Sequence, residues 1–340
     1  MNEFGIIGVG RIGASMARNM LSKGIKISLY DKNFINSDNE LNSSLIYDDL
    51  AGFVNSISKP RKILIFVPSG GPSNEVISEL IQNLDSNDII IDGGNTNPGV
   101  SFDNHQKVKS KNLLYLGMGV SGGVKGVLKG PSIMIGGDIK AYDQIKNSLS
   151  LITSKTIDNS QSFKLFGDSN QGHFVKMIHN GIEYVEMQLI SSVYYIMINS
   201  KKYNYDDIAK IFEKWNDSEL QSYLLEISIR KILEKTDDGH LIDRIDDEAE
   251  DNGTGRWMLN YAIELGCSVN MLNAALDSRF ISKSKDDRKK ISEKTEVSHK
   301  NYEIDIDALT KAYSFCRLIN FIQAFLLINS ANKKYGWNIS

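Results

Sequence analysis

The fold is decided close to the start of the chain, by the stretch Phe4-Gly5-Ile6-Ile7-Gly8-Val9-Gly10-Arg11-Ile12-Gly13. A short apolar run leads into the spacing G-x-G-x-x-G, and a helical pattern then continues to Leu21. A glycine turn between a strand and a helix lets backbone N–H groups and the helix N-terminus hold a pyrophosphate. The spacing alone is a weak signal, but its place between strand and helix favours a dinucleotide-binding unit.

An acidic residue follows the next predicted strand. That strand is Lys26-Ile27-Ser28-Leu29-Tyr30, and it ends at Asp31. A carboxylate about 20 residues beyond the glycines is where such units bind the ribose 2′-hydroxyl of adenosine. The same carboxylate repels a 2′-phosphate, so we expect NAD to be preferred. Lys32 is able to swing onto a 2′-phosphate, which leaves NADP open, and a chance glycine turn in another α/β protein remains the alternative.

Two further apolar runs predict strands that are buried on both faces of a parallel sheet. They are Ile63–Val67 and Ile89–Asp92, and each is followed by a glycine-containing loop and a helical pattern. Ligands bind at the carboxyl ends of strands in open α/β sheets. The loops next to Val67 and around Asn95 are therefore candidates for ligand contact, although Asn95 is also an ordinary turn residue.

Glycine is dense again in the stretch Ser121-Gly122-Gly123 and in the later run Gly130-Pro131-Ser132-Ile133-Met134-Ile135-Gly136-Gly137. Glycines at this density let a backbone approach a ligand closely. From about Ser169 the pattern becomes helical, so we place a domain boundary between Phe166 and Gln171. The sequence predicts an α/β Rossmann domain with a parallel sheet over residues 1–168, followed by an all-α helical domain over residues 169–340.

The helical part opens with an amphipathic stretch over residues 172–188. At about 100° per residue, its apolar residues Phe174, Ile178, Val185 and Leu189 share one face. The opposite face carries an amine, an imidazole, an amide, a carboxylate and a phenol, which suits acid–base work on a polyhydroxylated substrate. An ordinary amphipathic helix with a charged surface remains the alternative. The residues on the polar face are Lys176, His179, Asn180, Glu183, Tyr184 and Met187.

Composition narrows the class of protein. At 340 residues the chain is long enough for two domains, since single cores stop growing at roughly 250 to 300 residues. A net charge of −3 with mixed signs lacks the basic surface that nucleic-acid binding needs. Cys267 and Cys316 lie outside any metal-ligand spacing, which indicates a reducing compartment and no metal site.

Neither secretion nor membrane insertion is expected. The N-terminus lacks the basic and apolar regions of a signal peptide, so a cytoplasmic location fits. The apolar tract Tyr313–Ile328 is interrupted by polar residues and is shorter than the roughly 20 residues that a membrane span needs. We interpret it as a buried helix. The mixed charges over residues 286–300 predict a solvated helix or loop.

Three stretches together resemble one enzyme family. Residues 173–188 read His-Phe-Val-Lys-Met-x-His-Asn-Gly-Ile-Glu-Tyr-x-x-Met-Gln, residues 92–95 read Asp-Gly-Gly-Asn, and Val-Ser-Gly-Gly at 120–123 precedes Gly-Pro-Ser-x-Met-x-Gly-Gly. These motifs resemble those of the decarboxylating 6-phosphogluconate dehydrogenases. The related 3-hydroxyisobutyrate dehydrogenases share the Lys but follow it with Asn-Asn, and they usually lack the Gly-Pro-Ser. The resemblance extends from Gly5 to Trp337.

The resemblance implies oxidative decarboxylation of 6-phospho-D-gluconate to D-ribulose 5-phosphate and carbon dioxide with reduction of NAD(P), a step of the pentose phosphate pathway. It implies that Lys176 takes the C3 hydroxyl proton and then polarises the ketone, and that Glu183 protonates C1 of the enediol. The implied substrate residues are Asn95, Ser121, Gly122, Gly123, His179, Asn180, Tyr184, Arg256 and Arg279. The implied coenzyme residues are Gly8, Gly10, Arg11, Ile12, Gly13, Asp31, Lys32, Val67 and Asn95.

Two positions depart from patterns in the resembled family. Its Gly-Thr-Gly-Lys-Trp segment appears here with Arg256 in place of the Lys. An arginine keeps the charge and forks two hydrogen bonds to phosphate, but it is longer and planar. NADP-dependent members carry Asn-Arg-Thr-like residues after the second strand, where this chain has Tyr30-Asp31-Lys32-Asn33. Without the flanking motifs, Arg256 and Arg279 are equally well read as surface charges.

Two other functions remain open at this point. One is a β-hydroxyacid dehydrogenase that acts on another acid, and the other is a non-enzymatic homologue that only binds nucleotide or a partner. The resembled family continues beyond the segment that matches residues 335–339, with a tail whose Arg and His reach the substrate phosphate of the partner subunit. We therefore expect an uncovered apolar face around Ala312 to Asn329, self-association into a homodimer, and a weakened or inactive enzyme that retains nucleotide binding.

Overall fold

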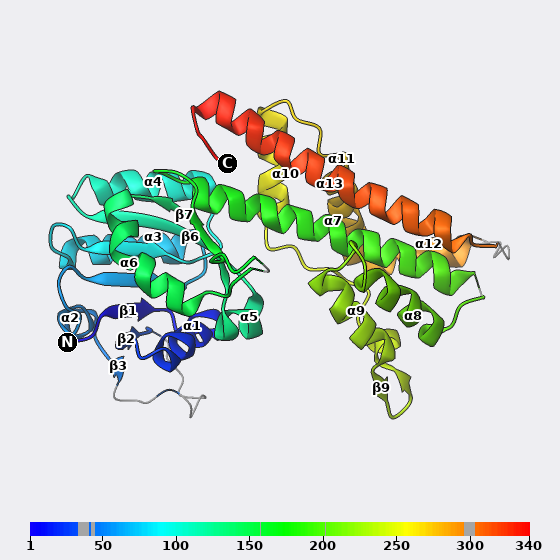
Figure 1. Cartoon of the computed structure of the whole chain (residues 1–340), viewed down its shortest axis with the longest axis horizontal. Helices are drawn as coiled ribbons and strands as arrows, with labels where there is room; N and C mark the ends of the chain where they lie inside the picture. The colour runs from blue at the N-terminus through cyan, green and yellow to red at the C-terminus, as the bar shows by residue number, and fades with distance from the viewer. Residues whose placement is uncertain (33–40, 42–44, 157, 201, 296–302) are drawn as a thin grey trace. The chain divides into compact units, whose positions relative to one another are not determined.

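The computed structural model describes residues 1–32, 41, 45–156, 158–200, 202–295 and 303–340. The chain forms two compact units (Figure 1). The first comprises Met1–Met177 together with Asn332–Ser340, and the second comprises Ile178–Ala331. The chain crosses between the units twice, each time inside a long helix, after Met177 and after Ala331, so its last residues belong to the first unit. The boundary expected after residue 168 stays a prediction.

The first unit contains a sheet of eight strands within the described residues, in the order β3-β2-β1-β4-β5-β6-β7-β8. The strands are β1 (Phe4–Ile7), β2 (Ile27–Tyr30), β3 (Ile46–Tyr47), β4 (Lys62–Ile65), β5 (Ile89–Asp92), β6 (Leu114–Ser121), β7 (Ser132–Gly137) and β8 (Phe163–Leu165). Strands β1 to β6 are parallel, which confirms the predicted sheet for most of its width.

The last two strands run in the opposite direction to the rest. Strand β7 pairs antiparallel with β6, and β8 pairs parallel with β7. The chain between β6 and β7 holds only the short helix α5 (Gly123–Lys129). A parallel return to the other end of the sheet needs a crossover of about a dozen or more residues. The predicted Rossmann domain with a parallel sheet is confirmed, and β7 and β8 are a reversed pair at one edge of it.

Helices cover both faces of this sheet, so its strands are buried on both sides as predicted. On one face Ile6 and Leu29 join a core with Met16 of α1. On the other face Ile63 and Ile65 join a second core. The other helices of the unit are α1 (Arg11–Ser22), α2 (Leu50–Asn55), α3 (Gly71–Asn83), α4 (Pro98–Lys109) and α6 (Ile139–Ile152).

The second unit is built from helices, as predicted, with one small exception. A two-stranded antiparallel hairpin of β9 and β10 lies within the helical unit. The elements are α7 (Gln171–Asn199), α8 (Tyr205–Asn216), α9 (Tyr223–Leu233), β9 (Lys235–Thr236), β10 (Gly239–His240), η2 (Leu241–Arg244), α10 (Thr254–Glu264), α11 (Asn270–Lys283), α12 (Lys285–Lys294) and α13 (Ile306–Tyr335). Of the predicted solvated charge run, residues 296–300 lie outside the described residues.

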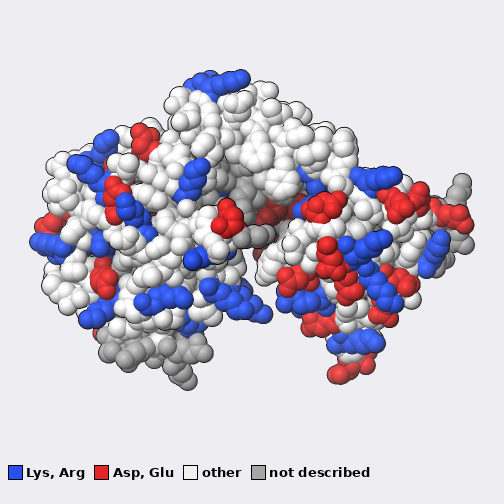
Figure 2. Space-filling view, in the orientation of Figure 1, with Lys and Arg blue, Asp and Glu red and all other residues white. Residues whose placement is uncertain are grey.

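Helix α13 differs from the buried helix that the sequence suggested. It is 30 residues long, and by length and composition it is apolar enough to span a membrane. Only part of it is buried, because a single stripe that includes Asn320 and Leu327 packs inward. The predicted uncovered apolar face is confirmed, and Figure 2 shows few charges over the middle of α13. Its large exposed apolar residues are Phe315, Leu318, Phe321, Ile322, Phe325 and Leu326.

A buried ion pair joins α13 to α7 inside the second unit. Arg317 Nε donates to Glu186 Oε2 at 3.0 Å, and Tyr313 Oη donates to the other carboxylate oxygen at 2.5 Å. The Arg317 guanidinium also donates to the Leu220 carbonyl at 2.7 Å. Glu186 is only 5% exposed, so its charge depends on these partners. This cluster explains why a charged residue sits in the apolar tract.

Replacing Arg317 by Met should lower the free energy of unfolding by about 3 to 5 kcal/mol, because it leaves the Glu186 carboxylate buried without its cation. Urea unfolding measures the change. Arg230→Met is the control, since its ion pair with Glu226 is more than half exposed and should contribute at most about 1 kcal/mol. Equal, small effects of the two substitutions would contradict the structural role of the buried pair.

Candidate functional site

The glycine turn after β1 has the shape that a dinucleotide needs. Gly8 has a positive φ of 89°, and a Cβ on Gly13 would lie 1.9 Å from the Gly8 carbonyl oxygen. Gly10, in contrast, has open space where its Cβ would be. It begins α1 without a side-chain cap, and Arg11 and Ile12 form the first turn. The residues present therefore fit a pyrophosphate approaching the helix N-terminus.

Asp31 and Lys32 both have partners in the first unit. The Val9 N–H donates to Asp31 Oδ2 at 2.7 Å, so the carboxylate at the end of β2 braces the glycine turn. Lys32 Nζ lies 2.7 Å from Glu79 Oε1 on α3. This ion pair is half-exposed, and it holds Lys32 toward α3. Asn33, which the sequence grouped with them, lies outside the described residues.

The other predicted coenzyme and substrate positions of this unit follow the carboxyl ends of parallel strands. Val67 follows β4, Asn95 follows β5, and Ser121 is the last residue of β6. The first two loops touch, because a Cβ on Gly94 would lie 3.3 Å from the Val67 carbonyl oxygen. Carboxyl ends of parallel neighbours share one edge of the sheet. The structure thus brings these residues to the edge that also holds the glycine turn.

Backbone conformation shapes the loop after β6. Gly122 has a φ of 140° and Gly123 a φ of 56°, conformations that favour glycine. Both residues are exposed, and they open the short helix α5. Ser121 beside them is half-buried. An exposed backbone with positive φ at the ligand edge suits close approach to a small polar molecule.

The start of α7 packs directly on the sheet. A Cβ on Gly119 of β6 would lie 2.3 Å from the Lys176 Cβ, so only glycine permits the contact. A Cβ on Gly172 would likewise meet backbone atoms of Gly117 and Gly136 within 2.6 Å. These contacts set Lys176 beside the end of β6, where its side chain is partly exposed.

The polar face predicted for α7 continues into the second unit. His179 Nδ1 lies 3.5 Å from Glu183 Oε2, one helical turn apart. Asn180 is buried, and Tyr184 is buried with its hydroxyl donating to Asn252 Oδ1 at 2.8 Å. The opposite apolar residues Phe174, Ile178 and Val185 are buried as predicted.

The two candidate phosphate-binding arginines are each held by a neighbour. Arg256 Nε lies 2.7 Å from Asp251 Oδ2, and the Asp251 side chain is almost fully buried while Arg256 is mostly exposed. A guanidinium on a mostly exposed side chain suits an anionic ligand, which it can hold through two parallel N–H groups. The Arg279 guanidinium lies 3.9 Å from the ring centroid of Tyr184 and donates to the Glu250 carbonyl.

Three residues that shape these sites were missed in the sequence. Asp251 orients Arg256, Glu79 holds Lys32, and His173 is completely buried at the start of α7. The partners of Glu79 and His173 lie on distant elements, so no local pattern marks them, whereas Asp251 lies five residues before Arg256. His173 does precede Lys176 by one helical turn in the signature stretch, which was the one available signal.

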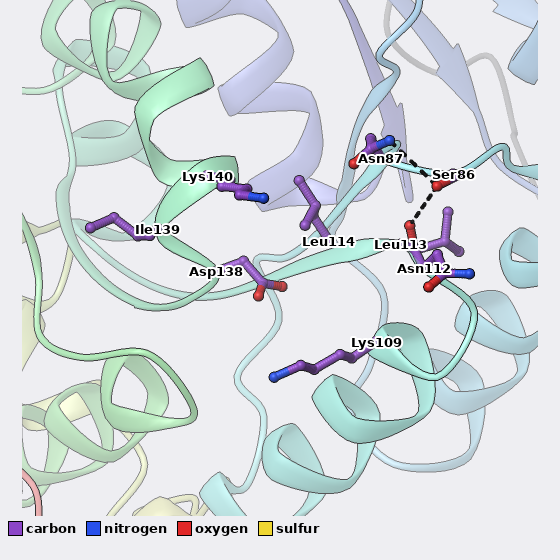
Figure 3. Close-up of a pocket in the computed structure, with 9 residues that line it drawn as sticks. All are labelled: Ser86, Asn87, Lys109, Asn112, Leu113, Leu114, Asp138, Ile139 and Lys140. Atoms are coloured by element: carbon purple, nitrogen blue, oxygen red, sulfur yellow. Dashed lines mark hydrogen bonds between the residues drawn. The ribbon is translucent and has the colours of Figure 1, made fainter.

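A hollow of about 410 Å³ in the first unit is lined by residues other than the predicted site residues (Figure 3). It is lined at the amino ends of β5 and β6, next to the start of α6, by Ser86, Asn87, Lys109, Asn112, Leu113, Leu114, Asp138, Ile139 and Lys140. None of the predicted site residues lines it. Ligand sites of open α/β sheets lie at the carboxyl ends instead.

Comparison with known families matches both parts of the chain. Residues 3–160 match the NAD binding domain of 6-phosphogluconate dehydrogenase, and residues 172–340 match the 6-phosphogluconate dehydrogenase C-terminal domain. The first unit is therefore a dinucleotide-binding domain of the kind that takes NAD or NADP.

Individual relatives agree with the family match. The decarboxylating 6-phosphogluconate dehydrogenase of Buchnera aphidicola is 36% identical over 350 residues, which cover 99% of this chain and 74% of that protein. The solved 6-phosphogluconate dehydrogenase of Plasmodium falciparum is 33% identical, with a TM-score of 0.91 over 99% of this chain and 75% of that one. A Mycobacterium tuberculosis 3-hydroxyisobutyrate dehydrogenase shares the fold at a TM-score of 0.63 but only 14% identity, covering 92% of this chain and 99% of that one. With both halves matched and this identity across nearly all of its length, the chain belongs to the decarboxylating 6-phosphogluconate dehydrogenase family.

Proposed function

We propose that the chain oxidatively decarboxylates 6-phospho-D-gluconate to D-ribulose 5-phosphate and carbon dioxide while NAD(P) is reduced. The observation that carries the proposal is the polar face of α7, with Lys176 packed beside β6 and Glu183 further along the same helix. Spacings of three, four and seven residues return to one face of a helix. Family membership supports the same reaction.

Lys176 is the proposed base that takes the proton of the C3 hydroxyl. A bound NAD(P) supplies the hydride acceptor. Having gained the proton, Lys176 stabilises the negative charge that develops on the C3 oxygen as the carboxylate leaves as carbon dioxide. Glu183 lies about two turns further along α7 and is the proposed acid for C1 of the enediol. No metal ion takes part in this scheme, and its absence stays a prediction.

The remaining candidate residues are proposed to hold the substrate. Asn95 and the Ser121-Gly122-Gly123 backbone supply donors at the edge of the sheet, and His179 and Asn180 supply them on α7. The anionic phosphate is assigned to the arginines of the second unit. Arg256 presents its guanidinium from the buried Asp251, and Arg279 stacks on Tyr184.

The rival activity is that of another β-hydroxyacid dehydrogenase, and substrate choice separates the two. Coenzyme reduction should be much faster with 6-phosphogluconate than with unphosphorylated gluconate or 3-hydroxyisobutyrate. Each charge-assisted phosphate contact is worth about 1.5 to 3 kcal/mol, which corresponds to roughly 10- to 150-fold in kcat/KM. Equal use of the unphosphorylated acids would favour the rival.

NAD is proposed as the preferred coenzyme, with NADP as the alternative. Asp31 places a carboxylate beside the glycine turn, and Lys32 is occupied by Glu79. The Plasmodium falciparum structure was solved with NADP+, which concerns that protein. A homodimer, a cytoplasmic location and the absence of nucleic-acid and membrane partners also stay proposals. The face seen in Figure 2 carries both basic and acidic side chains, which supports the proposed absence of a nucleic-acid partner.

Gly10→Ala should weaken coenzyme binding at least tenfold without loss of stability. Its backbone φ of −69° suits alanine and nothing lies within 4 Å of the new methyl group, which would occupy the approach to α1. Gly13→Ala should instead destabilise the fold by about 1 to 3 kcal/mol, because its Cβ meets backbone. Coenzyme titration and thermal unfolding of both variants test this. Unchanged affinity in Gly10→Ala would contradict the assigned cradle.

Asp31→Asn should lower the ratio of kcat/KM with NAD to kcat/KM with NADP by about tenfold or more, since a repulsive charge is removed. Glu79→Gln releases Lys32 and should lower the same ratio by at most about fivefold, as expected for a half-exposed pair. Steady-state kinetics with both coenzymes measures the ratio. If kcat/KM of the unsubstituted protein with NADP equals or exceeds kcat/KM with NAD, the proposed preference for NAD is refuted.

Lys176→Met should reduce coenzyme reduction by at least about 10² to 10⁴-fold and leave nucleotide affinity unchanged, because a general base is lost. Glu183→Ala should slow release of the final product more than the oxidation itself. Lys210→Met is the control, since Lys210 is exposed on α8 and lies outside both sets of site residues. Near-normal turnover of Lys176→Met would show that Lys176 is not the general base.

A further inference from the structure

A group of buried polar side chains lies next to the candidate catalytic residues of the first unit. They come from β5, the loop after it, α4, β6 and α7, and none is more than 3% exposed. Burying a polar group costs folding free energy unless the group is hydrogen-bonded, and a buried network with its hydrogen bonds satisfied holds its members rigidly. We call it the Asp92 network, and its members are Asp92, Thr96, Ser101, Tyr115 and His173.

The Asp92 carboxylate fixes the loop that carries Asn95. It accepts hydrogen bonds from the Gly94 N–H at 3.0 Å, from the Thr96 hydroxyl at 3.0 Å and from the Tyr115 hydroxyl at 3.1 Å. Two of these donors belong to the loop itself and flank Asn95 in sequence. The conformation of the loop is therefore tied to one buried carboxylate.

Ser101 continues the network to α7. Its Oγ lies 3.4 Å from the Tyr115 hydroxyl and 2.8 Å from His173 Nδ1. A Cβ on Gly117 would lie 2.8 Å from that nitrogen and 2.9 Å from the serine Oγ, so Gly117 makes room for the contact.

The His173 ring also lies against the loop itself. Burial lowers its pKa, and the negative charge of Asp92, followed by the backbone of Gly94 and Asp92, opposes that shift in part. The Ser101 contact at Nδ1 is the hydrogen bond of the ring to another side chain within the described residues, and it helps to orient the ring. The imidazole is thus held neutral between α7 and the loop.

We infer that the Asp92 network positions Lys176 relative to Asn95. Asp92 precedes Asn95 by three residues, and His173 precedes Lys176 by three residues. The network therefore links the segment just before Asn95 to the segment just before Lys176. The inference rests on the proposed function of those two residues. A misplacement of 1 Å in reacting groups costs about 10²-fold in rate. Tyr115 and His173 are positioning residues in this scheme.

Tyr115→Phe and His173→Ala each break the network at one atom or ring, and each should lower kcat about 10- to 100-fold while coenzyme affinity stays within twofold. His173→Asn retains a polar atom near the place of Nδ1 and should recover most of the loss. The double variant Tyr115→Phe/His173→Ala should lose no more than the worse single variant, since both break one network.

The matched control lies at the other end of the same strand. Asp88 precedes β5, is equally buried, and accepts from the Arg61 N–H at 2.7 Å and from the Arg61 guanidinium at 2.8 Å. Asp88→Asn should lower the unfolding midpoint and leave kcat unchanged.

If the Asp92-network variants behave like Asp88→Asn, losing stability while kcat stays within twofold, the network is structural only and the inference is overturned. Multiplicative losses in the double variant, or no recovery in His173→Asn, would also overturn it. A parent protein that does not reduce coenzyme with 6-phosphogluconate overturns the proposed function and this inference with it. An active parent with insensitive variants overturns the inference alone.

Discussion

Direct backbone contact between the start of α7 and the sheet is the constraint that fixes where the proposed catalytic residues lie. Gly172 of α7 packs against Gly117 and Gly136 of the sheet. A Cβ on Gly172 would lie 2.5 Å from the Gly136 nitrogen and 2.6 Å from the Gly117 oxygen. Gly119 of β6 likewise leaves room for Lys176, because a Cβ on Gly119 would lie 2.3 Å from the Lys176 Cβ. Because no side chain intervenes, the helix has little freedom to shift. Lys176 is therefore set by backbone packing, and the rest of the polar face follows from helix geometry.

The parts of the fold that depend on local pattern were predictable from the sequence. Continuous apolar runs indicated buried parallel strands, and the glycine spacing placed the turn before α1. The two faces of α7 could be separated by periodicity alone. The edge of the sheet that gathers Val67, Asn95 and Ser121 also followed, since carboxyl ends of parallel strands share an edge.

The rest depended on contacts and connections that no local apolar pattern marks. The reversal of β7 and β8 is set by the length of the connection through α5, which the apolar pattern does not encode. The sequence predicted both a buried helix over residues 313–328 and an uncovered apolar face, and only the contacts of α13 show which of its sides is covered. The His173–Ser101 bond joins α7 to α4, and the Asp251 side chain turns onto Arg256 in the helix that follows it, so the sequence marked only one partner of each.

Oxidation and decarboxylation of one substrate by one protein are the two linked steps of the proposed reaction. The most direct test supplies 6-phosphogluconate labelled with carbon-14 at C1 to the purified chain and measures labelled carbon dioxide beside reduced coenzyme. The account predicts that the two products form in equal amounts throughout the reaction. Coenzyme reduction without release of labelled carbon dioxide would show a dehydrogenase of another kind, and would contradict the proposed reaction.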